Sequence, residues 1–321
     1  MTVGFRDIEI ASERIHGLVH NTPVVQSEQL NRLTGLSLNF KAEHLQKVGA
    51  FKARGAVNAI CSINKNQLKH GVVAHSSGNH GAALARAGAL MNVPVSIVVP
   101  VNASRVKKKA IANYGARVIE CESSLASREL TLEELVENTN ATFVHPYDDE
   151  LIIAGAGTAA LELADQVVGL DVIVTPVGGG GLLAGTTLVA QAKGIKVFGA
   201  EPAGADDAAR SFRTGDRVLD HLPQTICDGL LTTLGDRNWD IIYSGVDDIL
   251  VVSDEDTVSA MYLIWTRMKQ VVEPSAAIAL AAVLSNKALF AGLKIGIVLT
   301  GGNVDLADLP FDPFNEVGNL V

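Results

Sequence analysis

The chain is organised around the stretch Lys47-Val48-Gly49-Ala50-Phe51-Lys52-Ala53-Arg54-Gly55-Ala56-Val57-Asn58. The preceding residues Leu38 to Lys41 have the pattern of a short strand, and the stretch itself has helical spacing. We therefore expect Lys52 in the first turn of a helix, where the helix dipole carries about half a positive charge. That charge and the nearby Arg54 are expected to lower the pKa of Lys52 and favour its neutral, nucleophilic form. Because most lysines are solvated surface charges, a catalytic role for Lys52 has to be supported by motifs elsewhere in the chain.

The composition is that of an ordinary globular protein. The 321 residues are 48% hydrophobic and 19% charged, which lies outside the range of disordered chains. Lys and Arg number 26 against 35 Asp and Glu, for a formal net charge of -9. The short basic run Arg105 to Lys109 is expected on a solvated helix face, so we expect no nucleic acid partner.

The cysteines and the apolar runs predict a cytoplasmic protein. Cys61, Cys121 and Cys227 are odd in number and lack C-x-x-C spacing, which argues against a disulfide framework or a zinc site. The N-terminus lacks the apolar segment of a secretion signal. The longest uncharged run, Val172 to Ala192, is interrupted by Pro176 and four glycines. We read this run as a buried strand, a turn and a helix, and we expect no membrane partner.

Strand and helix patterns alternate along most of the chain. Strands are predicted around Phe40 and at 72–74, 95–99, 118–120, 142–144, 172–174, 197–199 and 295–299. Helices are predicted at 8–18, 27–33, 82–90, 105–114, 131–136, 157–167, 182–192, 258–271 and 276–284. This alternation predicts parallel β-α-β units and the α/β class. We expect two lobes, with residues 1–64 and 149–321 in a large domain, 65–148 in a small domain, and a ligand cleft between them.

Two loops between a predicted strand and a predicted helix suit anions. The loop His75-Ser76-Ser77-Gly78-Asn79-His80-Gly81 offers hydroxyl, amide and imidazole groups to a carboxylate or phosphate, although Ser and Asn also cap helices without further function. In Pro176-Val177-Gly178-Gly179-Gly180-Gly181-Leu182 the glycines allow backbone amides to approach a phosphate. The same loop has a competing interpretation. Gly179-x-Gly181-x-x-Ala184 with Glu201 downstream fits a relaxed dinucleotide fingerprint, which would indicate an NAD(P)-dependent oxidoreductase.

A third loop, Leu299-Thr300-Gly301-Gly302-Asn303-Val304-Asp305, places a neutral hydroxyl at the end of the last strand, where an ordinary turn is the alternative. An NAD enzyme has no special use for a buried Lys52 or for a carboxylate receptor. A phosphorylated aldehyde cofactor needs an amine, a phosphate cradle, a partner for its ring nitrogen and a receptor for the substrate carboxylate. This combination predicts pyridoxal phosphate (PLP) chemistry.

The motifs resemble those of the fold-type II PLP enzymes, in particular the serine/threonine dehydratase and serine racemase family. The matching stretches are Gln46-Lys47-x-Gly49-x-Phe51-Lys52-x-Arg54-Gly55-Ala56, Ser76-Ser77-Gly78-Asn79-His80-Gly81, Gly178-Gly179-Gly180-Gly181-Leu182, Glu273-Pro274-Ser275 and Thr300-Gly301-Gly302-Asn303. The likeness runs in order from about residue 10 to 308. It implies a two-lobed fold like that of the tryptophan synthase β chain, with parallel sheets flanked by helices, a mobile small domain and a homodimer.

The resemblance also implies roles for single residues. Lys52 would hold the cofactor as a Schiff base and act as general base, while Ser77 on the opposite face would move a proton. Cofactor-binding residues would be Phe51, Lys52, Asn79, Gly178, Gly179, Gly180, Gly181, Leu182 and Thr300. Substrate-binding residues would be Ser76, Ser77, Asn79, His80 and Arg128. A divalent cation (Mg²⁺, Mn²⁺ or Ca²⁺) would be held by Glu201, Asp207 and the carbonyl of Ala205, which are hard oxygen donors, although helix-capping acids are the alternative.

Departures from the common family pattern bear on the substrate. Ala50 stands where Ser is usual and Tyr147 where Asn is frequent, and both changes resemble the branch that dehydrates 3-hydroxyaspartate. A guanidinium at Arg128 would suit a second carboxylate. Thr232 and Thr233 resemble the ordinary dehydratase and racemase pattern instead. The end of the sequence at residue 321 leaves no room for a C-terminal regulatory domain, so feedback inhibition by isoleucine is not expected.

We therefore expect a PLP-dependent ammonia-lyase that dehydrates serine, threonine or 3-hydroxyaspartate to a 2-oxo acid and ammonia, with racemisation as a side or main activity. Two alternatives stay open at this point. One is the NAD(P)-dependent oxidoreductase, and the other is a catalytically silent amino-acid-binding or regulatory protein that keeps the carboxylate loop.

Overall fold

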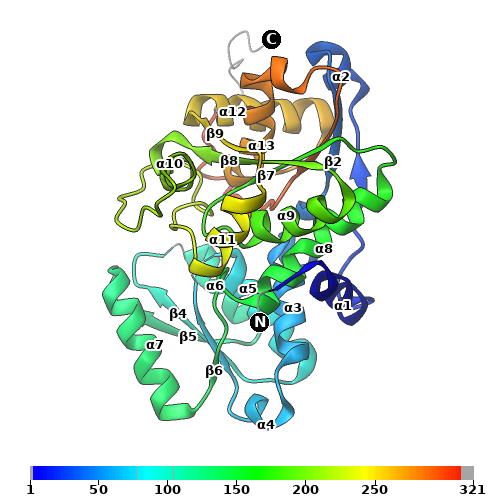
Figure 1. Ribbon diagram of the computed structural model, residues 1–321. Coiled ribbons are helices and arrows are strands. Elements are labelled where there is room, and N and C mark those ends of the chain that lie inside the picture. Colours follow the sequence, from blue (N-terminus) through cyan, green and yellow to red (C-terminus); the bar gives the residue numbers. More distant parts are fainter. Residues whose placement is uncertain (1–2, 77, 104, 312–321) are drawn as a thin grey trace.

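The strands form two separate sheets, which occupy the upper and lower halves of the view in Figure 1. The structure, a computed structural model, describes residues 3–76, 78–103 and 105–311. The larger sheet has the strand order β1-β2-β10-β7-β8-β9, and the smaller has the order β5-β4-β3-β6.

The larger sheet draws its strands from both ends of the described chain. They are β1 (Val24–Val25), β2 (Ser37–Lys41), β7 (Val172–Pro176), β8 (Lys196–Pro202), β9 (Asp248–Val252) and β10 (Lys294–Val298). All neighbouring strands are parallel except β1, which pairs antiparallel with β2. The predicted α/β class is confirmed, with β1 as a short antiparallel addition at the edge.

The smaller sheet comes from one continuous part of the chain. Its strands are β3 (Val72–His75), β4 (Val95–Pro100), β5 (Arg117–Cys121) and β6 (Thr142–Phe143), and all pairs are parallel. One apolar cluster, which includes Val73, Val98 and Leu132, comes from this part of the chain alone, and a second, which includes Val72 and Ile97, is shared with α1, α3 and α8. The predicted boundaries of a large domain and a small mobile domain stay a prediction.

Helices cover both sheets. They are α1 (Phe5–Ile15), α2 (Glu28–Thr34), α3 (Lys52–Ser62), α4 (Lys65–Leu68), α5 (Asn79–Met91), α6 (Arg105–Asn113), α7 (Leu125–Thr139), α8 (Glu150–Gln166), α9 (Gly181–Lys193), α10 (Asp207–Thr214), α11 (Asp236–Gly245), α12 (Asp254–Leu263) and α13 (Pro274–Ser285). The uncharged run 172–192 is β7, the glycine loop and α9, as predicted. Among the described residues, no helix combines the length and the hydropathy that a membrane span requires.

One predicted helix is wrong at its end. The predicted helix at 258–271 is α12 followed by a single π-helical turn from Ile264 to Met268. Lys269 then adopts a left-handed conformation with φ of 58°, which ends the helix because an L-residue cannot continue a right-handed helix from that region. The prediction also omitted α10, α11 and β9.

Close packing between glycines fixes the helix that begins with Lys52. A Cβ atom added to Gly155 of α8 would lie 2.6 Å from Cα of Gly55 in α3, and one added to Gly185 of α9 would lie 2.7 Å from the backbone nitrogen of Gly157. Only glycine permits helices to approach so closely. Helices α3, α8 and α9 therefore form one tightly packed unit, and the start of α3 is held against the larger sheet.

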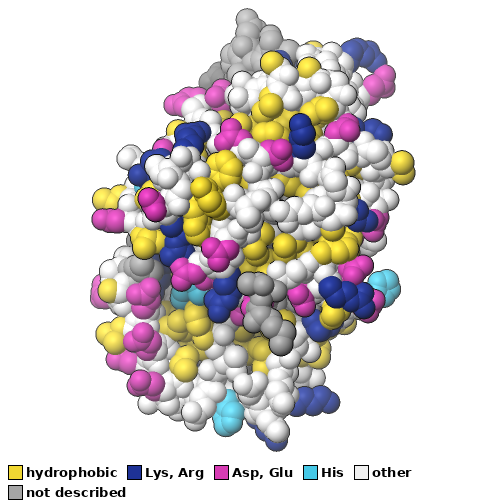
Figure 2. Space-filling view, in the orientation of Figure 1, with side chains coloured by type: hydrophobic (Ala, Val, Ile, Leu, Met, Phe, Trp, Pro, Cys, Tyr) yellow, Lys and Arg dark blue, Asp and Glu magenta, His cyan; other side chains and the backbone are white. Residues whose placement is uncertain are grey.

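The surface agrees with the charge balance of the sequence. Figure 2 shows Lys and Arg interspersed with Asp and Glu over the visible face, without a continuous basic patch on it. Such a face offers no electrostatic footprint for a nucleic acid backbone.

Candidate active site

Lys52 is the first residue of α3, as predicted. Its side chain is partly buried, and Nζ donates a hydrogen bond of 2.8 Å to the carbonyl oxygen of Pro146. Nζ also lies 5.2 Å from the ring centroid of Phe51. Burial lowers the pKa of Lys52 to about 8. Because desolvation disfavours the ammonium, a larger share of this amine is neutral near pH 7 than for an ordinary lysine.

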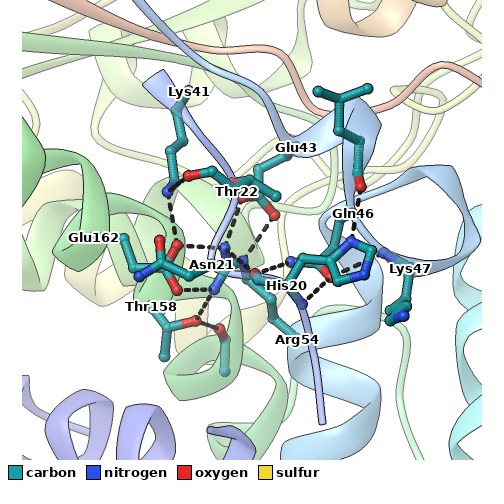
Figure 3. Close-up of polar contacts among 12 residues, drawn as sticks. His20, Asn21, Thr22, Lys41, Glu43, Gln46, Lys47, Arg54, Thr158 and Glu162 are labelled. Atoms are coloured by element: carbon teal, nitrogen blue, oxygen red, sulfur yellow. Dashed lines mark hydrogen bonds and ion pairs between the residues drawn. The ribbon is translucent and has the colours of Figure 1, made fainter. Parts of the chain in front are cut away.

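The predicted cause of this shift was partly wrong. Arg54 does not direct its charge at Lys52, because its guanidinium is fully buried and paired with Glu43 and Glu162 (Figure 3). Nε of Arg54 lies 2.7 Å from Glu43 Oε2, and Nη2 of Arg54 lies 2.7 Å from Glu162 Oε2. Burial of the amine, rather than the guanidinium, accounts for the lowered pKa of Lys52.

A second buried cation completes this network. Lys41 of β2 donates to Glu162 Oε2 at 2.7 Å and to the carbonyl of Thr22 at 2.6 Å. Two cations and two carboxylates therefore lie together, and Figure 3 shows them at the centre of the contacts between α3, α8 and the chain around residue 20. Their charges balance, so the network joins these segments without leaving a net buried charge.

Thr300 lies beside the start of α3. The backbone nitrogen of Phe51 donates to the carbonyl of Thr300 at 3.0 Å, and Ala50 forms an isolated β-bridge with Gly301. The Thr300 side chain is 5% exposed, and its hydroxyl donates to the carbonyl of Ser275 at 3.4 Å. The structure therefore brings the predicted partner of a ring nitrogen next to the lysine, 248 positions away in the sequence.

The glycine loop connects β7 to α9 and is shaped by close contacts. Gly180 has φ of 91°, which favours glycine, and a Cβ on Gly179 would lie 2.3 Å from the ring of Tyr147. Within the described residues, no side chain caps the N-terminus of α9. Uncapped amides at a helix start are an anion-binding arrangement, which fits a phosphate group. Leu182, the second residue of α9, is buried beneath the loop.

Asn79 opens α5 and belongs to a hydrogen-bonded cluster. Its Nδ2 donates to Glu273 Oε1 at 2.8 Å, and its Oδ1 accepts from Asn303 Nδ2 at 2.8 Å. Glu273 also accepts from the backbone nitrogen of Asn303 at 3.1 Å. Burial, together with the charge of Asp228, raises the pKa of Glu273 to about 7. The motifs around Glu273 and Asn303 were recognised in the sequence, but their contact with Asn79 was not.

The predicted carboxylate receptor lies at the carboxyl end of β3. The Ser76 hydroxyl accepts from the backbone nitrogen of Gly78 at 3.3 Å, and Ser77 lies outside the described residues. His80 is 3% exposed, and burial followed by the charge of Lys52 holds its pKa well below the ordinary value. Neither ring nitrogen of His80 has a side-chain hydrogen bond within the described part of the chain. The backbone of Val144 lies close enough to the imidazole to act on its pKa in the opposite direction.

Arg128 lies on α7, the helix that packs against β3, β4 and β5 of the smaller sheet. Burial, followed by the charges of His145 and Arg128, lowers the pKa of His75 to about 4, whereas burial raises the pKa of Tyr147 and the Arg128 charge acts weakly against that rise. The buried Nε of Arg128 has no hydrogen-bond partner among the described residues. A carboxylate is the group that a guanidinium without such a partner pairs with best.

The predicted cation ligands also lie together. Glu201 of β8 and Asp207 of α10 are each 1% exposed, and Ala205 is fully buried in the short 3₁₀ turn between them. Burial raises the pKa of Glu201 to about 9 and that of Asp207 to about 6. Both Glu201 oxygens accept from backbone amides of α10, Ala208 at 2.8 Å and Ala209 at 2.7 Å. These contacts leave Glu201 poorly placed for a dinucleotide ribose, the role that the competing interpretation required.

The donor set fits a hard divalent cation. Oδ2 of Asp207 is buried and has no hydrogen-bond partner in the residues that the structure describes. Burial disfavours the ionised form of both carboxyls, a bound cation would favour it, and carboxylate and carbonyl oxygens suit Mg²⁺, Mn²⁺ or Ca²⁺. Helix capping accounts for the Glu201 contacts but leaves this Asp207 oxygen unexplained.

Comparison with known proteins agrees with this geometry. The family described as pyridoxal-phosphate dependent enzymes matches residues 15–301. The beta-hydroxyaspartate dehydratase of Paracoccus denitrificans is 45% identical over 310 residues, covering 96% of this chain and 98% of that protein. The L-threo-3-hydroxyaspartate ammonia-lyase of Saccharomyces cerevisiae is 43% identical, covering 94% of each chain. The crystal structure of serine racemase from Dictyostelium discoideum superposes with a TM-score of 0.91 at 46% identity, covering 95% of this chain and 100% of that one. Because the family matches most of the sequence and the structure contains a partly buried lysine and an uncapped glycine loop, this chain belongs to the pyridoxal-phosphate dependent enzyme family.

Proposed function

We propose that this protein is a PLP-dependent ammonia-lyase that removes the β-hydroxyl of 3-hydroxyaspartate and releases a 2-oxo acid and ammonia. The observation that carries the choice of substrate is the place of Arg128, whose buried Nε has no partner among the described residues. A substrate with a second carboxylate would supply that partner. Relatives named for hydroxyaspartate chemistry at 43–45% identity support the same choice.

The residues fit the cofactor. The uncapped amides of the glycine loop would hold the phosphate, Asn79 has one amide hydrogen left to donate, and Phe51 lies beside Lys52. Bound PLP would supply an aldehyde that captures the substrate amine and a ring that withdraws electrons from the Cα carbon. Thr300 would face the ring nitrogen with a neutral hydroxyl, which cannot stabilise a positive charge there as a carboxylate would.

The protein's own groups would then move protons and bind carboxylates. Lys52 would act as general base toward the Cα proton, because its lowered pKa makes the neutral amine available near neutral pH. Ser76, Asn79 and His80 would bind the α-carboxylate and Arg128 the side-chain carboxylate. For Ser77, which is outside the described residues, the family resemblance implies proton exchange on the opposite face, which would permit racemisation.

A spectrum and a substrate panel test this proposal. The purified protein should be yellow, and borohydride should fix the cofactor covalently to the peptide that contains Lys52, as mass spectrometry would detect. Release of 2-oxo acid should be fastest from a 3-hydroxyaspartate isomer, compared with L-serine, D-serine and L-threonine. A colourless protein that binds NADH would contradict the proposal, and a yellow protein that turns over none of these substrates would leave only a binding function.

Arg128→Gln is expected to change the choice of substrate. The variant keeps much of the side-chain length but loses the charge, so kcat/KM for 3-hydroxyaspartate should fall by about 10- to 100-fold, the value of a charge-assisted hydrogen bond of 1.5–3 kcal/mol. Activity with serine should change by less than about threefold. Steady-state kinetics with both substrates measures the difference, and an equal loss on both would remove the argument for a diacid.

We also propose a divalent cation at Glu201, Asp207 and the carbonyl of Ala205. Its support is the unpartnered oxygen of Asp207 and the raised pKa values of both carboxyls. Because these ligands must lose their protons to bind metal, affinity for the cation should rise with pH through the range in which Asp207 and then Glu201 ionise.

Asp207→Asn should remove the response to the cation. For the wild type, Mg²⁺ at 100 times its dissociation constant should add about 2.7 kcal/mol to the free energy of unfolding, and EDTA should reverse the gain. Thermal unfolding with Mg²⁺, Mn²⁺, Ca²⁺ or EDTA measures this. Asp206→Asn is the matched control, because Asp206 lies next in the chain but pairs with Arg210 at 2.8 Å. A wild type whose unfolding ignores all three cations would contradict the site.

Three further expectations belong to this proposal. The enzyme would act as a homodimer, which size-exclusion chromatography with light scattering tests. It would work in the cytoplasm, which suits the unpaired Cys61, Cys121 and Cys227.

The segment 65–148 would move as a small domain when substrate binds, and hydrogen exchange with and without substrate would detect that movement.

A further inference from the structure

A tight turn between β6 and α8 holds the hydrogen-bond partner of Lys52. Nδ1 of His145 accepts from the backbone nitrogens of Tyr147 at 3.3 Å and Asp148 at 2.9 Å. These bonds fold the chain back around Pro146, whose carbonyl receives the Lys52 ammonium at 2.8 Å. Any shift of the turn 145–148 would therefore move the group that orients the lysine.

The same turn forms a wall of the glycine loop. A Cβ on Gly179 would lie 2.3 Å from Cγ of Tyr147, and a Cβ on Gly181 would lie 2.8 Å from the Tyr147 carbonyl oxygen. The loop and the turn are thus in contact at two residues of the loop, Gly179 and Gly181. Contact alone, however, does not fix their spacing, because a glycine loop has little side-chain packing to hold it.

A buried asparagine joins the two segments. Asn238 of α11 is fully buried, and its Nδ2 donates to the Gly179 carbonyl at 2.7 Å and to the Tyr147 carbonyl at 3.2 Å. Both amide hydrogens are used, one on each segment. The Gly179 carbonyl has a second donor, the backbone nitrogen of Gly235 at 3.1 Å, so the residue that precedes α11 contacts the loop through its backbone as well.

We propose that Asn238 is a positioning residue that fixes the spacing between the Lys52 amine and the phosphate cradle of the glycine loop. This inference rests on the proposed binding of phosphate by that loop. A cofactor held covalently at one end and by its phosphate at the other needs both attachment points at a set separation. Asn238 sets this separation because it joins the carbonyl next to Pro146 to the carbonyl of the loop. It touches neither substrate nor reacting atoms in this role.

Asn238→Asp tests the inference with a side chain of the same shape. An ionised carboxylate offers no hydrogen to either carbonyl and is repelled by both, so the loop and the turn should separate. We expect the dissociation constant for PLP, measured by absorbance titration of protein freed of cofactor, to rise at least about tenfold, the equivalent of one lost hydrogen bond. Asn238→Leu removes the donor without adding charge and should weaken PLP to a similar degree.

Asn39→Asp provides the matched control. Asn39 is 1% exposed, and its Nδ2 also donates to two backbone carbonyls, Ser37 at 3.4 Å and Ile295 at 3.2 Å, near the opposite ends of their strands from the site. Its Oδ1 accepts from Nε2 of Gln26, a bond that an aspartate keeps, whereas Oδ1 of Asn238 has no partner among the described residues. The variants at 39 and 238 should lose comparable thermal stability without cofactor. The dissociation constant for PLP should change by less than about twofold in Asn39→Asp.

The pH dependence separates positioning from a general loss of structure. A protonated aspartic acid at position 238 can donate one hydrogen bond, so the ratio of its PLP dissociation constant to that of the wild type should fall as the pH is lowered. The ratio for Asn238→Leu should stay constant over the same range.

These measurements separate a positioning role of Asn238 from a general loss of structure. Wild-type affinity for PLP in both Asn238 variants would overturn the inference, as would an equal loss of affinity in Asn39→Asp. If Asn238→Asp fails to fold, the neutral Asn238→Leu gives the same comparison. A wild-type protein that binds no PLP would instead overturn the proposed function on which the inference rests.

Discussion

Lys52→Ala is expected to abolish turnover of every substrate and the absorbance of covalently bound cofactor. The change removes the amine whose Nζ contacts the carbonyl of Pro146 at 2.8 Å, next to Tyr147, the residue that packs against the glycine loop. Loss of a positioned base alone costs about 10²- to 10⁴-fold in rate, and loss of the covalent bond adds to that. Absorbance spectra, mass spectrometry after borohydride and release of 2-oxo acid measure the effect.

Lys65→Ala controls for the general effect of removing a lysine. Lys65 begins α4 and is exposed, so its loss should leave the spectrum and the rate unchanged. The circular dichroism of Lys52→Ala should match that of the wild type, because the lysine lies at the start of α3 and makes a single side-chain hydrogen bond within the described residues. Normal turnover or a borohydride-fixed cofactor in Lys52→Ala would end the assignment of this lysine.

Local sequence patterns predicted the parts of the site that follow strands. The glycine loop after β7, the polar loop after β3 and Thr300 after β10 could be placed because the carboxyl ends of parallel strands gather at one edge of a sheet. The lysine could be placed at a helix start for the same local reason. These predictions needed only the alternation of strands and helices and the residue types at their junctions.

Long-range partners could not be predicted in this way. Asn238 contacts residues 59 and 91 positions away, and no spacing rule within α11 distinguishes it from an ordinary helix residue. The effect of Arg54 on Lys52 was wrong for a related reason. The sequence shows the proximity of Arg54 to Lys52 in the chain, but not the carboxylates of Glu43 and Glu162 that fix the direction of the guanidinium.

Glu43→Gln is expected to destabilise the protein by about 3–5 kcal/mol, because it leaves the two buried cations, Lys41 and Arg54, with Glu162 as their one remaining carboxylate in the network. Glu43 is fully buried, and both its oxygens accept from Arg54, at 2.7 and 2.8 Å. Although burial acts to raise the pKa of Glu43, the Arg54 charge holds it below the ordinary value of 4.5. Urea unfolding at neutral pH measures the change in the free energy of unfolding.

The pH dependence of the loss in the free energy of unfolding is a second, independent test of the Glu43–Arg54 pair. A carboxyl whose pKa is lowered in the folded state contributes stability above its unfolded pKa, and this contribution disappears as the pH falls through the folded value. The difference between the wild type and Glu43→Gln should therefore be full at neutral pH and shrink below about pH 4.5.

Glu28→Gln removes an ion pair of similar geometry from the surface, Arg32 Nη2 to Glu28 Oε1 at 2.5 Å, and should cost no more than about 0.5 kcal/mol because both side chains are exposed to solvent. A Glu43→Gln variant as stable as Glu28→Gln would mean that the buried network contributes no more than a surface pair. A loss of several kcal/mol in Glu43→Gln alone would instead identify the network of Lys41, Glu43, Arg54 and Glu162 as the element that fixes α3 to α8. The lysine at the start of α3 then keeps its place beside the glycine loop because Arg54, two residues further along the same helix, cannot move without exposing an unpaired charge.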